Sequence, residues 1–146
     1  MDQLSILIVD DEEEFLRSAS FALRSAGFTS VETTTEPKTV MARISEKDYS
    51  AILLDIMMPF LSGRELLGMI ASMNPDIPVI MITAVNEIEV AVGCIKEGAY
   101  DYVLKPFSLS EVKLAVSNAL ERHRLTTENA RLRELTQLFN ISERIA

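Results

Sequence analysis

The chain has 146 residues and 48% of them are hydrophobic, which is enough to bury a core and excludes disorder over most of the length. Its negative charge lies in residues 1–120, which hold 18 acidic and 9 basic side chains, whereas residues 121–146 hold four Glu and five Arg. Because an acidic body repels a phosphate backbone and the mixed tail forms no basic stripe, we expect no direct contact with nucleic acid in this segment.

Neither a membrane span nor a secretory signal is visible in the sequence. The apolar runs are far shorter than the roughly 18 residues that a membrane span needs. The first residues, Met1–Gln3, carry no basic region of the kind that begins a secretory signal. Cys94 is the single cysteine, so an internal disulfide is excluded, and we expect Cys94 to be structural and inert. These features predict a cytoplasmic protein.

Short apolar segments alternate with segments of helical periodicity. Strands are expected at residues 6–9, 29–34, 51–54, 79–82 and 100–104. Helices are expected from Glu12 until Gly27 stops the helix, from Pro37, from a cap at Ser62 until just before Asn74, from Asn86 to Lys96 and from a cap at Ser108. The apolar faces of the first and third helices include Phe21 and Met69. The alternation predicts an α/β protein with a parallel sheet, helices on both faces and right-handed crossovers.

The last predicted helix is longer than the sheet on which it could pack. Between Ser110 and Arg144 there is neither proline nor glycine, and Leu125, Leu132 and Phe139 recur every seven residues. The seam is short and its companion positions are partly polar, so three interpretations stay open: a helical dimer seam, a seam that needs a downstream domain, and a frayed tail. We expect residues 1–120 to form one domain and residues 121–146 a helical extension, as a coiled-coil dimerisation or linker segment.

Four of the predicted strands end on polar residues of a particular kind. Asp10 and Asp11 follow the first strand, Asp55 the third, Thr83 the fourth and Lys105 the fifth. Each residue alone is explained more simply as a cap, a turn residue or a solvated lysine. Because the carboxyl ends of parallel strands share one edge, however, three carboxylates, a hydroxyl and an ammonium are expected to meet there. Such a set can bind a divalent cation and a phosphoryl group.

The local context of these residues resembles the receiver domain of response regulators in two-component signal transduction. The segment Asp55–Pro59, with Gly63 eight residues after Asp55, looks like that family's phosphoacceptor loop. Thr83-Ala84 looks like its switch threonine, and Lys105–Phe107 like its lysine and following cis peptide bond. The resemblance covers about residues 3–120. It implies a doubly wound, flavodoxin-like sheet of five parallel strands in the order 2-1-3-4-5, with the long C-terminal helix as a linker.

The resemblance also implies a phosphorylation chemistry. Asp55 would be the nucleophile that takes a phosphoryl group from a sensor histidine kinase. Mg²⁺ prefers oxygen ligands, which Asp11, Asp55 and the Met57 carbonyl can supply directly and Asp10 through a water. Lys105 would neutralise charge on the phosphoryl oxygens. We expect no enzyme activity beyond this self-catalysed phosphorylation and dephosphorylation, and we expect Met57 and Val85 to slow the latter.

In the family, the phosphoryl group draws in the switch threonine and an aromatic on the last strand turns inward. Here these residues would be Thr83 and Tyr102, although Tyr102 is also explained as a half-buried edge residue. The expected result is a shift between two packings of the last-helix face, which would control a homodimer or a downstream output domain. His123 is expected on a solvated helix surface rather than in a phosphorelay.

Two other functions fit parts of this pattern less well. An aspartate-nucleophile phosphohydrolase also uses a strand-end aspartate and magnesium, but it usually has a second acid two residues after the nucleophile, where Met57 stands. A flavodoxin-like cofactor binder needs small phosphate-binding residues in its first loop, where acids at 10–14 would repel a phosphate. The sequence favours the signalling module and leaves its kinase, its output and its phosphoryl lifetime open.

Overall fold

A computed structural model describes the backbone of residues 4–145 and the side chains of residues 4–129 and 131–137. Within this part of the chain, five parallel strands form one sheet in the order β2-β1-β3-β4-β5. The strands are β1 Ser5–Val9, β2 Ser30–Thr34, β3 Ala51–Asp55, β4 Val79–Thr83 and β5 Asp101–Leu104. The predicted fold class and strand order are therefore confirmed.

The unbroken apolar runs form the centre of the sheet. Every residue of β1, β3 and β4 is buried, as expected for strands that are covered on both faces. Strands β2 and β5 lie at the two edges and are only partly buried. The pairing of Val9 with Leu54 and of Asp55 with Ile82 aligns the ends of the central strands. The residues that follow these strands are therefore brought to one edge of the sheet.

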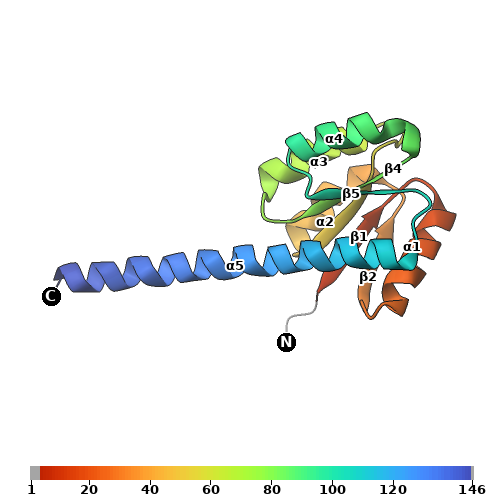
Figure 1. The fold of residues 1–146 in the computed structure, drawn as a ribbon. Helices are drawn as coiled ribbons and strands as arrows, with labels where there is room; N and C mark the ends of the chain where they lie inside the picture. The colour runs from red at the N-terminus through yellow and green to blue at the C-terminus, as the bar shows by residue number, and fades with distance from the viewer. Residues whose placement is uncertain (1–3, 146) are drawn as a thin grey trace.

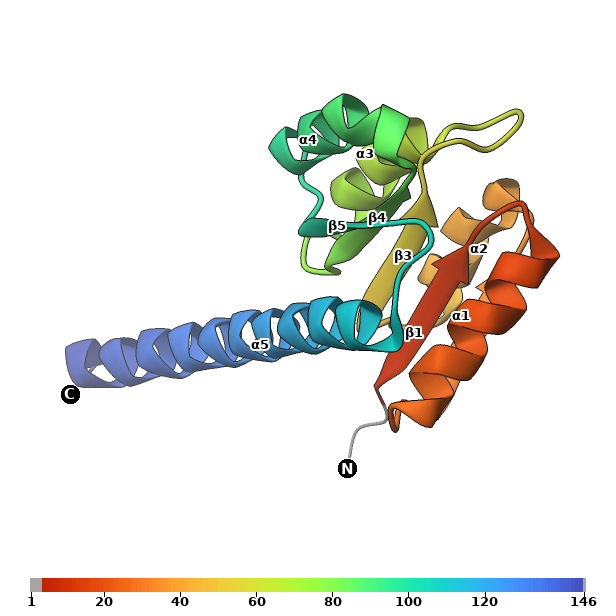
Figure 2. The same cartoon turned by 45° about the vertical axis from the view of Figure 1, so that its right-hand side comes forward.

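Helices cover both faces of the sheet (Figures 1 and 2). Helices α1 Glu13–Ser25 and α5 Leu109–Ile145 pack on one face, and α2 Val40–Glu46, α3 Gly63–Met73 and α4 Ile88–Lys96 on the other. The predicted helices at Pro37 and Asn86 begin as short 3-10 turns, η1 Pro37–Thr39 and η2 Val85–Glu87. Each face thus has its own apolar layer, which we call the α1–α5 layer and the α2–α4 layer.

The predicted helix ends agree with the structure. The Ser62 hydroxyl accepts a hydrogen bond from the Glu65 N–H at the start of α3, and the Ser108 hydroxyl accepts one from the Glu111 N–H at the start of α5. After α1, the backbone of Gly27 takes a φ of +104°, which glycine adopts without strain. Local sequence therefore determines where these helices begin and end.

Two predictions about buried helix faces are wrong. Phe21 is 74% exposed and Met69 is 44% exposed. Helix α1 buries Leu16, Ala19 and Leu23, which are spaced by three and four residues, and Phe21 lies off that stripe. Met69 likewise lies off the stripe that α3 buries. A hydrophobic residue on a helix therefore does not by itself indicate a buried position.

Helix α5 packs on the sheet with its first half and projects from the body with its second half (Figure 1). Its 37 residues correspond to a length of about 55 Å. Leu125, Leu132 and Leu135 lie on the projecting half and are about half exposed. The side chain of Phe139, the third member of the predicted heptad series, lies outside the described residues. In the described part of the chain, no helix is long and apolar enough to cross a membrane.

Contact between α5 and the body continues past residue 120. The Arg122 guanidinium lies 5.1 Å from the centre of the Tyr100 ring. The Nδ1 atom of His123 lies 3.1 Å from the Asp76 carbonyl oxygen, close enough for a hydrogen bond from the ring. These contacts attach the helix to the body at the end of the sheet opposite to the carboxyl ends of the strands.

Candidate functional site

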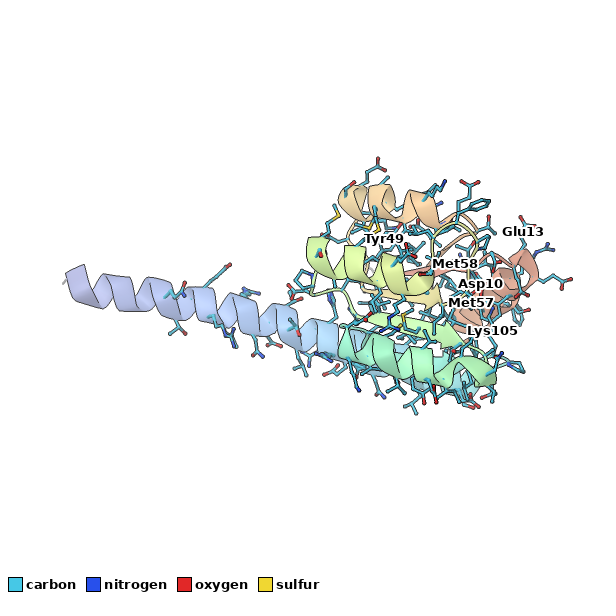
Figure 3. All side chains as sticks on the ribbon, turned by 90° about the horizontal axis from the view of Figure 1, so that it is seen from above. Asp10, Glu13, Tyr49, Met57, Met58 and Lys105 are labelled. Atoms are coloured by element: carbon cyan, nitrogen blue, oxygen red, sulfur yellow. The ribbon has the colours of Figure 1, made fainter. Side chains whose placement is uncertain are left out.

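The carboxyl ends of the strands bring together four of the predicted site residues. A carboxylate oxygen from each of Asp10, Asp11 and Asp55 lies within 4.8 Å of the others. The Lys105 ammonium lies 2.6 Å from Asp10 Oδ2 and 3.8 Å from Asp55 Oδ2. Figure 3 labels Asp10, Met57 and Lys105 at the end of the body that lies away from the projecting half of α5. We call these four side chains the carboxylate edge.

Burial raises the pKa values of the two inner carboxylates of this edge, Asp10 and Asp55. Asp10 is fully buried and Asp55 is 5% exposed, whereas Asp11 is exposed. Burial, together with the neighbouring charge of Asp10, raises the pKa of Asp55 to about 7, although Lys105 opposes the shift. Burial also raises the pKa of Asp10, against the contact with Lys105 and a hydrogen bond from the Glu12 N–H. The edge therefore holds more negative charge than one ammonium neutralises.

Lys105 supplies the positive charge of the edge. Burial alone would lower the pKa of its ammonium, but the contacts with Asp10 and Asp55 outweigh burial and raise it. Its backbone N–H also donates to the Thr83 carbonyl at 2.8 Å, which ties the end of β5 to the end of β4. The peptide bond between Lys105 and Pro106 is cis, as the resemblance implied.

The donor set suits a hard divalent cation. It consists of carboxylate oxygens alone, which is the chemistry that Mg²⁺ prefers. The Oδ2 atom of Asp10 is buried and makes no well-directed hydrogen bond within the described residues, where the ammonium of Lys105 is its ion-pair partner. A backbone hydrogen bond from Met57 reaches the Asp55 carboxylate, which places that backbone beside the site. The residues present therefore fit a magnesium ion.

Gly63 allows α3 to begin directly against the Asp55 backbone. A Cβ atom at this position would lie 2.0 Å from the Asp55 carbonyl oxygen, and the Gly63 N–H donates to the Ile56 carbonyl at 2.9 Å. The resemblance included this glycine, and the structure supplies the physical reason. The loop between Asp55 and α3 depends on the absence of a side chain at Gly63.

The two predicted switch residues lie on neighbouring strands. Thr83 is fully buried at the end of β4, and its hydroxyl donates to the Ala84 carbonyl at 3.1 Å. Tyr102 is half-buried on the edge strand β5 and packs against the α2–α4 layer. The structure thus places Thr83 near the carboxylate edge and Tyr102 further back on β5.

An aromatic pair beside Lys105 was missed as part of the site. The Lys105 ammonium lies 4.3 Å from the centre of the Phe15 ring, within the range of a cation–π contact. The Phe15 ring meets the Phe107 ring edge to face, with centroids 5.3 Å apart and planes at 81°. In the sequence, Phe15 stands within the helix expected after Glu12, and its apolar side chain there predicts only helix packing. In the sequence, Phe107 indicates an aromatic contact near the site, because it stands two residues after Lys105.

Exposed apolar side chains stand in the segments that follow β3 and β4. Met57 and Val85, which we expect to hinder water, are both well exposed. Phe60 is 93% exposed and takes a φ of +71°, which is rare for a residue with a side chain. The Lys38 ammonium lies 5.5 Å from the centre of the Phe60 ring. No pattern in the sequence indicated this backbone conformation.

Comparison with known families matches residues 6–117 to the response regulator receiver domain. The chain is 38% identical over 134 residues to the nitrogen assimilation regulatory protein NtrX of Azorhizobium caulinodans, covering 90% of this chain and 29% of that protein. It is 32% identical over 133 residues to the C4-dicarboxylate transport transcriptional regulatory protein DctD of Rhizobium meliloti, covering 91% of this chain and 29% of that protein. The chain therefore spans less than a third of the length of each of these relatives.

Solved structures agree with the sequence comparison. The structure of NtrX from Brucella abortus superposes with a TM-score of 0.83 at 32% identity, covering 90% of this chain and 30% of that chain. The isolated receiver domain of the same protein superposes with a TM-score of 0.77 at 34% identity, covering 80% of this chain and 98% of that chain.

Proposed function

Since this chain belongs to the response regulator receiver domain family, we propose that it is a phosphoacceptor module in which Asp55 takes a phosphoryl group from a sensor histidine kinase. One observation carries this proposal: the buried Asp55 carboxylate lies at the sheet edge with two further aspartates within 4.8 Å and the Lys105 ammonium at 3.8 Å. A nucleophile, a counter-charge and a set of oxygen ligands are what phosphoryl transfer to a carboxylate requires.

The proposed reaction is a displacement at phosphorus. A carboxylate oxygen of Asp55 forms the new P–O bond while the P–N bond of the phosphohistidine breaks. The imidazole takes the bonding electron pair and leaves as the neutral ring, because its other nitrogen carries a proton. Lys105 lies close enough to Asp55 to neutralise charge on the phosphoryl oxygens and to pair with the product. The product is a mixed anhydride of the Asp55 carboxyl group and phosphate.

Asp10, Asp11, Asp55 and the Met57 carbonyl would hold a magnesium ion in this proposal. When bound, the ion supplies positive charge that stabilises the phosphoryl oxygens. The buried Asp10 Oδ2, which lacks a well-directed hydrogen bond among the described residues, supports this assignment. A nearby cation would also offset the neighbouring negative charge that helps to raise the pKa of Asp55, and would favour the ionised form that the reaction needs.

We further propose that phosphorylation is transmitted through Thr83 and Tyr102 to the face formed by α4, β5 and α5. Helix α5 belongs both to this face and to the projecting extension, so a change in its packing would reach any partner of that extension. The proposed division into a receiver domain at 1–120 and an extension at 121–146 is supported by the exposed leucines beyond residue 120. The contacts of Arg122 and His123 extend the attachment to the body by a few residues.

Intact-mass measurement tests the phosphoacceptor proposal. The purified chain would be incubated with acetyl phosphate and Mg²⁺, beside the variant Asp55→Asn and a sample without Mg²⁺. We expect the mass of one phosphoryl group on the wild type with Mg²⁺, and none on Asp55→Asn. Equal modification of the variant would contradict the assignment of Asp55.

A further inference from the structure

The Lys105 ammonium is enclosed by three carboxylates and one aromatic ring. It lies 2.6 Å from Asp10, 3.6 Å from Glu12 and 3.8 Å from Asp55, and 4.3 Å from the centre of the Phe15 ring. The Lys105 side chain is only 21% exposed, so its ammonium is largely withdrawn from water. The ring therefore takes the place that solvent would otherwise occupy.

The ring differs from the carboxylates in how it holds the ammonium. The contact with Asp10 is the shorter of the two, so the ammonium lies nearer to Asp10 than to Asp55. A ring face attracts a cation over a broad area and takes no hydrogen bond from it. An ammonium that shifts from Asp10 towards a phosphoryl group on Asp55 can therefore keep the ring contact during the movement.

The ring is itself fixed on both sides. Phe15 lies in the first turn of α1, and its ring packs against the α1–α5 layer. Phe107, two residues after Lys105, meets the Phe15 ring edge to face at 5.3 Å. The segment after β5 that carries Lys105 thus also carries Phe107, whose ring holds the Phe15 ring in place.

We propose that Phe15 is a positioning residue for phosphoryl transfer: its ring face holds the Lys105 ammonium between Asp10 and Asp55, where it can pair with the incoming phosphoryl group. This inference rests on the proposed function of Asp55. It assigns to a residue of α1 a part in the reaction that the apolar pattern of the helix does not reveal.

Fluorinated phenylalanines test this role without changing the shape of the side chain. Singly, doubly and triply fluorinated phenylalanine would be placed at position 15, and the rate of Asp55 phosphorylation by acetyl phosphate measured with Mg²⁺. Fluorine withdraws charge from the ring face, so we expect a graded fall that reaches about fivefold, the size of one cation–π contact. The same series at the exposed Phe21 of α1 is the matched control and should leave the rate unchanged.

Two ordinary variants complete the test. Phe15→Tyr keeps a ring face and should react at nearly the wild-type rate, whereas Phe15→Leu should be about fivefold slower. A flat fluorinated series at position 15, or equal losses in the Tyr and Leu variants, would overturn the inference and leave the phosphoacceptor function standing. A wild-type chain that takes no phosphoryl group would instead overturn the function on which the inference rests.

Discussion

At the carboxylate edge, Asp10, Asp55 and Lys105 are largely withdrawn from water, and the Lys105 ammonium lies within 4 Å of both carboxylates. In the projecting half of α5, Leu132 and Leu135 are each 53% exposed, and the described ion pairs are local ones such as Arg124 with Glu121 and Glu128. The fold itself gathers the charged groups of the first region, and the three carboxylates there share one ammonium. The second leaves Leu132 and Leu135 half exposed, so the two regions differ in how far the fold itself encloses their side chains.

The largest expected effect is the destabilisation that Gly63→Ala causes beside the carboxylate edge. The new Cβ would overlap backbone atoms of Asp55 that cannot move without shifting β3, so we expect the free energy of unfolding to fall by about 4 kcal/mol. Urea unfolding followed by circular dichroism would measure this. Gly68→Ala is the matched control, because no atom lies within 4 Å of its new Cβ and alanine favours the helix. Equal effects of the two substitutions would show that the close approach at Gly63 is not needed.

The crowding of charge at the edge predicts a pH-dependent effect of Asp55→Asn. A folded-state pKa of about 7, raised from 3.8, means that Asp55 favours folding below the lower value and loses this contribution as the pH rises through 7. Without Mg²⁺, the variant should therefore be more stable than the wild type by about 3 kcal/mol at pH 8, and by little at pH 4. Asp48→Asn, which replaces an exposed carboxylate, is the matched control. A constant difference at all pH values would contradict the perturbed environment of Asp55.

The projecting half of α5 predicts self-association through its leucines. We expect a concentration-dependent dimer in sedimentation velocity, and Leu132→Lys should weaken it about tenfold, or about 1.4 kcal/mol, because a charge replaces an apolar contact. Thr127→Lys, on the same half of α5 but away from the predicted seam, should have little effect. If the wild type stays a monomer at every concentration, the apolar surface would have to serve a different partner.

The smallest expected effect concerns the junction between the two regions. Arg122→Ala removes the contact with the Tyr100 ring and should lower the free energy of unfolding by about 0.5 kcal/mol. Arg131→Ala, further along the exposed helix, should leave it unchanged. Paired urea titrations would measure the difference. A larger effect at Arg131 would mean that the stability of the body depends on the extension.

The sequence predicted the parts of the fold that depend on simple patterns. Unbroken apolar runs identified the buried strands β1, β3 and β4, and the polar residues at the ends of β1, β3 and β5 identified Asp10, Asp55 and Lys105 as neighbours. This worked because parallel strands place their carboxyl ends at one edge regardless of the detailed packing.

The remaining features depend on packing between elements distant in sequence. Phe15 reaches Lys105 only because α1 lies beside the loop that follows β5, and the clash avoided at Gly63 exists only once α3 docks on β3. Phe21 and Phe60 show the opposite case, since both are apolar residues that the fold leaves in solvent. Hydrophobicity alone cannot distinguish these outcomes.

Reductive trapping tests the central claim most directly. The chain would be phosphorylated by acetyl phosphate with Mg²⁺ and treated with borohydride, which converts an aspartyl phosphate to homoserine, and the modified residue would be located by peptide mass spectrometry. The proposed function predicts homoserine at position 55 in the wild type. Homoserine at another aspartate, or at none while the intact protein carries a phosphoryl group, would contradict it.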